Sequence, residues 1–190
     1  MEGHAVAKAQ STGTSEEQTA AHLDWDHPFP NGIEQNSIEA ASVAVPFDLV
    51  SPTNLSQGQP DLIETSPPEA YPDGEGAVAF VYHTKEYGDV LVEESTPGGI
   101  TVERLADMAE ALGAPSPGSE ERSDAPDAFQ LVAVGDAKAL LVQYAGVGRI
   151  TWIQGGLLFD IKGDETTPEQ VVDLASELER EADKQLSPTG

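Results

Sequence analysis

Residues 128–162, AFQLVAVGDAKALLVQYAGVGRITWIQGGLLFDIK, contain four short apolar runs that are rich in β-branched residues and separated by glycine turns. The runs are 128–134, 138–145, 149–154 and 157–162, with links of two or three residues between them. A parallel connection needs a crossover of about a dozen residues or more, whereas antiparallel neighbours need only a tight turn. The stretch therefore predicts an antiparallel sheet.

The last two of these runs alternate between two kinds of side chain, which is typical of strands with one covered face. Ile150 and Trp152 share one side of the first of them, and Thr151 falls on the other. In the second, Leu157, Phe159 and Ile161 oppose Leu158, Asp160 and Lys162. We expect one face of the sheet to be mostly apolar and covered by a helix, and the other face to be mixed.

The rest of the chain predicts further strands and helices around this sheet. Apolar residues recur at helical spacing over 101–112 and again after Thr166 or Thr167, where Pro168 suits a first helical turn. Ser37 is a candidate N-cap for a brief helix. Strands are expected at 43–50, where Pro46 requires an edge position or a place among the first residues of the strand, at 62–63, and in a hairpin of 77–83 with 89–94.

These elements predict an α+β fold in which one or two amphipathic helices pack on one face of a curved antiparallel sheet. Residues 1–36 have no sustained apolar period and are expected to form a polar, poorly ordered tail or linker. Residues 37–186 are expected to form a single domain.

Charge is the strongest feature of the composition. The chain of 190 residues carries 34 acidic and 9 basic residues, a formal net charge of −25, and no cysteine. This balance argues against binding to nucleic acid and to anionic lipid, and the lack of cysteine excludes disulfides and thiolate metal sites. Two explanations of the acidity remain: a solvated surface, as in secreted or high-salt proteins, and a surface that binds cations or a basic partner.

Two segments resemble an extracytoplasmic domain of anti-sigma-factor-type proteins from actinobacteria and other Gram-positive bacteria. The first is IEAASVAVPFDLVSPTNL at 38–55, and the second is ITWIQGGLLFDIKG at 150–163, followed by a helix that opens with Thr167-Pro168-Glu169-Gln170. The resemblance covers about 37–182. Leu55-Ser56-Gln57-Gly58 departs from it, because the family has Leu-Pro-x-Gly at this turn.

The resemblance implies a fold distantly related to LolA and RseB, a half-barrel sheet wrapped on a helix. It implies a non-enzymatic sensory or binding domain that is extracytoplasmic, either secreted or tethered to a membrane. The partner would be a protein or a lipophilic small molecule, and a carrier of a lipophilic ligand is the alternative. The aromatic residues available to such a ligand are Phe80, Tyr82, Tyr144, Trp152 and Phe159, although core packing also explains them.

No catalytic, metal or cofactor motif stands out in the sequence, so we predict no catalytic residues, no metal site and no cofactor. His22, Asp24, Asp26 and His27 lie within six residues but lack a recognised metal spacing. An unrecognised hydrolase is a further alternative that rests only on the abundance of carboxylates. Neither a signal peptide nor a membrane-spanning segment is visible, and no direct membrane insertion is expected.

Overall fold

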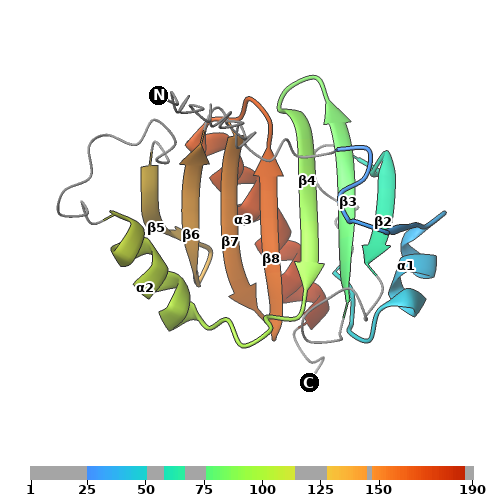
Figure 1. Ribbon diagram of the computed structural model, residues 1–190, viewed down its shortest axis with the longest axis horizontal. Helices are drawn as coiled ribbons and strands as arrows, with labels where there is room; N and C mark the ends of the chain where they lie inside the picture. The colour runs from blue at the N-terminus through green and yellow to red at the C-terminus, as the bar shows by residue number, and fades with distance from the viewer. Residues whose placement is uncertain (1–24, 51–57, 67–75, 114–127, 145–146, 187–190) are drawn as a thin grey trace, which may run out of the picture.

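The computed structural model describes residues 25–50, 58–66, 76–113, 128–144 and 147–186. These residues form one open, curved, antiparallel sheet of eight strands with three helices packed against it (Figure 1). The predicted α+β class with a curved antiparallel sheet is therefore confirmed.

The strands follow one another in a simple order across the sheet, β1-β2-β3-β4-β8-β7-β6-β5. The first four are β1 (Ile33–Glu34), β2 (Leu62–Ser66), β3 (Ala77–Thr84) and β4 (Gly88–Ser95). The last four are β5 (Ala128–Val134), β6 (Ala137–Tyr144), β7 (Val147–Gln154) and β8 (Leu157–Gly163). The helices are α1 (Ile38–Ala44), α2 (Val102–Gly113) and α3 (Pro168–Leu186).

The two halves of the sheet, β1–β4 and β5–β8, meet where β4 pairs with β8. In this ladder Leu91 lies opposite Lys162 and Glu93 lies opposite Asp160. Every other ladder joins strands that are consecutive along the chain. The β4–β8 register therefore decides how the two halves align.

One face of the sheet is covered by α1 and α3 and contains the main core. Trp152 stacks on Phe159 there with ring centroids 5.0 Å apart, and both side chains are fully buried. Gly148 and Gly163 lie opposite each other under the start of α3, where a Cβ would overlap Val171 or Thr166. The paired glycines allow the helix to approach the sheet closely.

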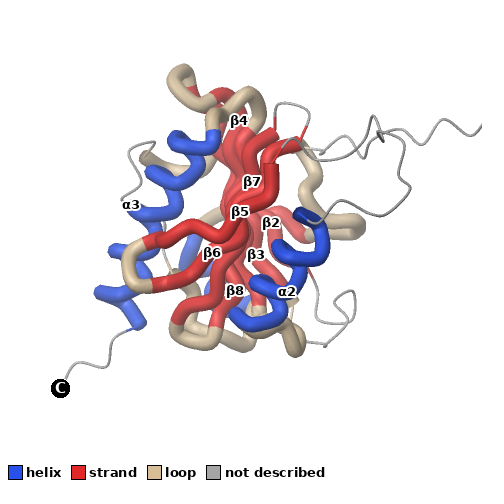
Figure 2. The backbone as a smooth tube through the Cα atoms, turned by 90° about the vertical axis from the view of Figure 1, so that its left-hand side faces the viewer, coloured by secondary structure: helices blue, strands red, loops and turns tan. Residues whose placement is uncertain are grey.

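The opposite face, which we call the second face, is covered at its two ends and has polar residues between them. Figure 2 shows α2 on the other side of the sheet from α3, over β5 and β6. At the other end Phe29 packs on Ala79, Val81 and Leu91 and is 8% exposed. A strip over β4, β8 and β7 lies between these two covers.

The segment before α1 is more ordered than its sequence indicates. Residues 25–36, which we expected in the tail, pack on the sheet: the Phe29 amide donates to Glu64 Oε2 at 2.9 Å, and β1 pairs with β2. This segment is ordered because the Phe29 ring packs on the apolar end of the second face and removes it from water. Residues 1–24 lie outside the described part of the chain.

The strand expected at 43–50 is wrong. Residues 43–44 belong to α1, and 45–50 are irregular. Pro46 has no amide hydrogen to give to a ladder, and the Val50 amide donates instead to the side chain of Glu94 at 2.9 Å. The other expected strands and both longer helices are present.

The helix starts agree with their sequence signals. The Ser37 hydroxyl accepts the Ala40 amide at 3.2 Å, and Thr167 exchanges hydrogen bonds with Gln170 as a capping box. None of the described helices combines the length and apolar character that crossing a bilayer requires.

Replacing Phe29 tests whether the N-terminal segment belongs to the folded domain. We expect Phe29→Ala to lower the free energy of unfolding by about 3 kcal/mol, because a ring that covers the second face is lost. The measurement is urea denaturation of the full chain. The control is Ile33→Ala on β1, whose side chain is 55% exposed and should cost less than about 1 kcal/mol. Equal stability of Phe29→Ala and the unmodified chain would contradict the packing described here.

Candidate functional site

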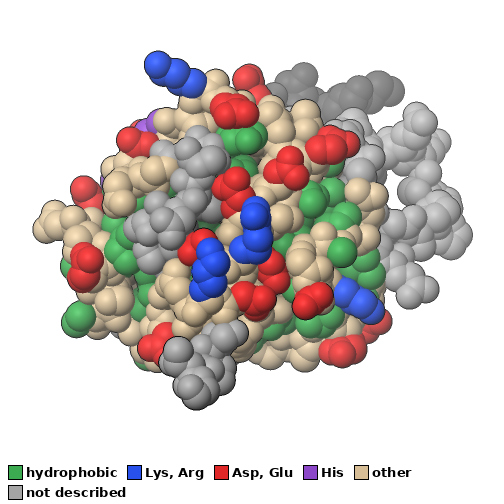
Figure 3. Space-filling view, turned by 180° about the vertical axis from the view of Figure 1, so that it is seen from behind, with side chains coloured by type: hydrophobic (Ala, Val, Ile, Leu, Met, Phe, Trp, Pro, Cys, Tyr) green, Lys and Arg blue, Asp and Glu red, His purple; other side chains and the backbone are tan. Residues whose placement is uncertain are grey.

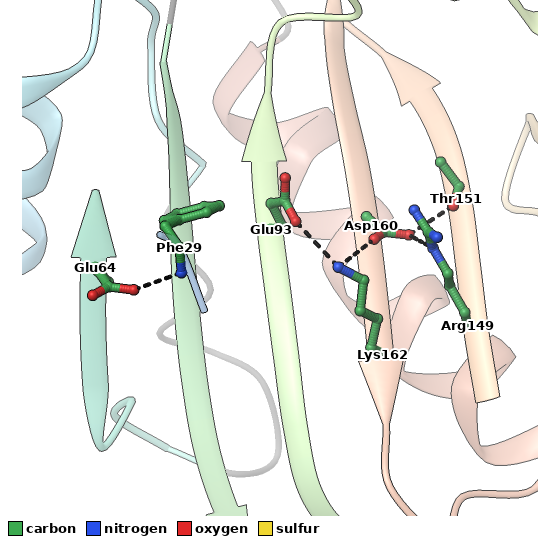
Figure 4. Close-up of polar contacts among 7 residues, drawn as sticks. All are labelled: Phe29, Glu64, Glu93, Arg149, Thr151, Asp160 and Lys162. Atoms are coloured by element: carbon green, nitrogen blue, oxygen red, sulfur yellow. Dashed lines mark hydrogen bonds and ion pairs between the residues drawn. The ribbon is translucent and has the colours of Figure 1, made fainter. Parts of the chain in front are cut away.

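The strongest concentration of interacting polar side chains in the described residues lies on the strip between the two covers of the second face. We call Glu93, Arg149, Thr151, Asp160 and Lys162 the polar cluster (Figure 4). They come from β4, β7 and β8, and alternation along each strand points them to the same side of the sheet.

The register of the sheet sets two carboxylates against each other in this cluster. Glu93 and Asp160 are directly opposite across β4 and β8, an arrangement that destabilises a ladder when both are charged. Lys162 resolves the conflict, because its Nζ lies 3.3 Å from Glu93 Oε2 and 3.1 Å from Asp160 Oδ2. The contact with Asp160 lacks hydrogen-bond geometry and is therefore ionic.

The second oxygen of Asp160 is held from β7. Arg149 Nε donates to Asp160 Oδ1 at 2.8 Å, and the Thr151 hydroxyl donates to the same oxygen at 2.7 Å. Asp160 and Thr151 are buried, whereas the Arg149 side chain is 51% exposed. Two acids and two bases thus share one network, whose formal charge is balanced.

The pKa values in the cluster follow from these contacts. Burial alone would raise the pKa of Asp160, but the charges of Arg149 and Lys162 outweigh it and lower the pKa. Burial alone would lower the pKa of Lys162, and the charges of Asp160 and Glu93 raise it instead. Because the network favours a charged Asp160, this carboxylate is a poor base for the Thr151 hydroxyl. The geometry suits a cross-strand clamp better than general acid–base chemistry.

Four of the five aromatic residues predicted for ligand binding lie in the main core. Phe80, Tyr82, Trp152 and Phe159 are at most 1% exposed and pack between the sheet and its covering helices. Tyr144 belongs to β6, and its side chain lies outside the described residues. A ligand would have to displace packed side chains to reach the four described rings. Their role in binding stays a prediction.

A buried carboxylate that the sequence analysis did not single out lies beside this core. Glu94 is fully buried on β4, where its Oε2 accepts the Val50 amide and its Oε1 has no hydrogen-bond partner. Burial raises the pKa of Glu94 to about 8, although the Val50 hydrogen bond acts in the opposite direction. Burial and the nearby Glu94 also raise the pKa of Tyr82.

The histidines that can be described make ordinary surface contacts. His83 Nδ1 lies 2.9 Å from Asp89 Oδ1 at the end of the β3–β4 hairpin, and this contact raises the pKa of His83. His27 Nδ1 lies 3.7 Å from Glu64 Oε1. His22 and Asp24 are outside the described residues. Among those that are described, no three His, Asp or Glu side chains gather as a metal site would require.

An open crevice lies between α3 and the β5 end of the sheet. It has a volume of about 230 Å3. Its lining residues are Gln130, Leu141, Pro168, Glu169, Val172 and Asp173. A small-molecule site usually needs about 300–1,000 Å3. The crevice is therefore better suited to a side chain than to a whole lipophilic ligand.

Sequence reasoning missed the polar cluster although one signal for it was present. Basic residues are scarce in this chain, and Arg149 and Lys162 both lie in runs predicted as strands, on the side that also holds Asp160. What the sequence does not reveal is that β4 pairs with β8 and brings Glu93 to this cluster.

Comparisons with known proteins identify no relative for this chain. No family model matches it, and no curated protein and no solved structure matches it at a significant level.

Replacing Lys162 tests the clamp across β4 and β8. We expect Lys162→Met to lower the free energy of unfolding by about 3 kcal/mol, because Glu93 and Asp160 then face each other without the cation between them. The measurement is urea denaturation at neutral pH. Lys184→Met removes the same charge from a pair on α3, where the lysine side chain is 68% exposed, and should cost less than about 1 kcal/mol. Equal losses in the two variants would contradict the clamp.

The buried Glu94 predicts a specific dependence of stability on pH. Its folded pKa lies above the ordinary value of 4.5, so its contribution to stability is fully present below that value and is lost as pH rises through about 8. Glu94→Gln keeps an acceptor for the Val50 amide but cannot ionise. We expect the unmodified chain to lose more stability than Glu94→Gln between about pH 5 and about pH 8 in urea titrations. Parallel pH profiles for the two proteins would show that Glu94 does not titrate in this range.

Proposed function

We propose that this chain is a non-enzymatic binding domain whose partner is a protein with basic character. In line with the resemblance noted in its sequence, we further propose that it is an extracytoplasmic sensory domain of the anti-sigma-factor type. Recognition would take place on the outer surface and the edges of the sheet rather than in an internal cavity.

The observation that carries this proposal is the closed core. The rings of Phe80, Trp152 and Phe159 are fully buried, and the sheet face that holds them is covered by α1 and α3. The interior that a small ligand would use is filled by side chains. This arrangement supports recognition of a macromolecule at the surface over capture of a small molecule.

The distribution of charge supports a basic partner. Figure 3 shows acidic side chains spread over the face that α3 covers, with few basic ones among them. Arg149 and Lys162 form ion pairs with Glu93 and Asp160, so the positive charges of the polar cluster are already used there. The excess of negative charge lies on other parts of the chain. A net charge of −25 steers cationic partners toward the protein and repels anionic ones.

The carrier alternative has less support from the described residues. It requires an apolar cavity, whereas the crevice beside α3 is small and has Glu169 and Asp173 among its lining residues. The hydrolase alternative requires a carboxyl group with a raised pKa that a substrate can reach. Glu94 has a raised pKa but is fully buried, and the pKa of Asp160 is lowered.

Selection of random short peptides displayed on phage against the immobilised full chain tests the proposed function. We expect enrichment of sequences containing Lys and Arg, and we expect their binding to weaken as salt increases, because exposed charges are screened. Native mass spectrometry of the purified chain serves as the second measurement. Failure to enrich any peptide, or a lipid that co-purifies in stoichiometric amount, would contradict the proposal.

A further inference from the structure

Strand β5 is the outermost described strand at one end of the sheet. It pairs with β6 on one side, and no other described strand pairs with it. Natural sheets protect such edges with very short strands, prolines or charges. The opposite end has a strand of only two residues, β1, whereas β5 has seven residues with the sequence AFQLVAV and neither charge nor proline.

The turn between β5 and β6 tells which backbone groups face outward. Gly135 and Asp136 form a two-residue turn, so Val134 and Ala137 are the hydrogen-bonded pair that closes the hairpin. Every second residue of β5 then bonds to β6. The amide and carbonyl groups of Phe129, Leu131 and Ala133 point away from it, toward a strand that could be added.

The crevice lies directly beside this edge. Gln130 of β5 and Leu141 of β6 lie opposite each other in the ladder, and both line the crevice together with Pro168 and Val172 of α3. A strand added to β5 would place every second side chain on the face that holds α3. One apolar side chain of that strand could therefore rest against Leu141 and Val172.

Two carboxylates that line the crevice favour a positively charged added strand. Glu169 and Asp173 are exposed, lie one turn apart on α3, and take part in no ion pair among the described residues. Like charges at this spacing disfavour a helix slightly. Lys or Arg side chains flanking the apolar one would offset that repulsion.

We propose that the edge of β5 is a docking site for an extended segment of a partner protein. The segment adds to β5 as a further strand, inserts one apolar side chain into the crevice, and pairs Lys or Arg with Glu169 and Asp173. This inference rests on the proposed function and adds the place and the mode of recognition. A second copy of this chain is a poorer occupant, because acid would then face acid.

The probe is the capped peptide Thr-Lys-Thr-Leu-Thr-Lys-Thr, whose two lysines and leucine share one face in an extended conformation. Titration into the 15N-labelled full chain, followed by NMR, gives both the affinity and the residues affected. We expect the shifted amides to include those of Leu131 and Ala133. A peptide with Glu in place of Lys, and one methylated on alternate backbone amides, should each bind about tenfold more weakly or not at all.

Matched variants of the chain separate the site from general electrostatics. Glu169→Gln with Asp173→Asn should weaken the probe about tenfold, whereas Glu34→Gln with Asp48→Asn, which removes two charges at the other end of the sheet, should change it less than about twofold. Leu131→Pro removes a backbone amide that points away from β6, so no hydrogen bond between β5 and β6 is lost. We expect this variant to abolish binding of the probe, and we expect Leu131→Ala to retain most of the binding. Because Leu131→Pro could unfold the edge, the methylated peptide provides the independent test of strand addition.

The outcomes distinguish this inference from the function on which it rests. Equal weakening by the two charge-removing pairs, undiminished binding of the methylated peptide, or shifts confined to other elements would overturn the β5 site. Basic peptides enriched by phage selection would still support the proposed function in each of those cases. Dimerisation through β5 in analytical ultracentrifugation would overturn the basic partner as the occupant of this edge.

Discussion

The ladder between β4 and β8 is the constraint on which the rest of the structure depends. It is the only pairing between strands that are not consecutive along the described chain, and it unites two four-stranded halves into one sheet. The α3 helix can cover a continuous apolar face only when this ladder is in register. Lys162 between Glu93 and Asp160 makes that register favourable, because a slip of one residue would place Asp160 and Lys162 on the opposite face of the sheet from Glu93.

Most of the buried acidic side chains among the described residues accept hydrogen bonds from backbone amides. Glu64 accepts the Phe29 amide, Glu94 accepts the Val50 amide, and Glu179 receives a hydrogen bond from the Asp136 amide. With 34 acids and 9 bases, this chain has few cations to pair with its acids, and these three buried acids accept hydrogen bonds from backbone amides. The first two contacts fix the N-terminal segment and the loop after α1 against the sheet, and the third fixes the β5–β6 turn to α3. The buried acids therefore shape the fold, while the exposed ones set the charge.

Much of the fold follows from local patterns in the sequence. Alternation in 149–162 assigns Trp152 and Phe159 to one face and Asp160 to the other, and the structure confirms both placements. The patterns fail where a distant group decides the outcome. The 43–50 segment is β-rich by composition, but its Val50 amide is used by Glu94. The polar cluster depends on pairing between β4 and β8, which no local pattern encodes. The docking of Phe29 likewise depends on Glu64 and on residues of β3 that are far along the chain.

The position of β8 also bears on how the protein is made. When β1 to β4 have left the ribosome, β4 has no neighbour on its second side, and its amides stay open until β8 is synthesised near the other end of the chain. Strand β4 ends at Ser95 and β8 begins at Leu157, so the first four strands carry a bare hydrogen-bonding edge while the residues between them are synthesised, and such edges promote association between chains. Mutual repulsion between strongly negative nascent chains keeps them apart during that interval.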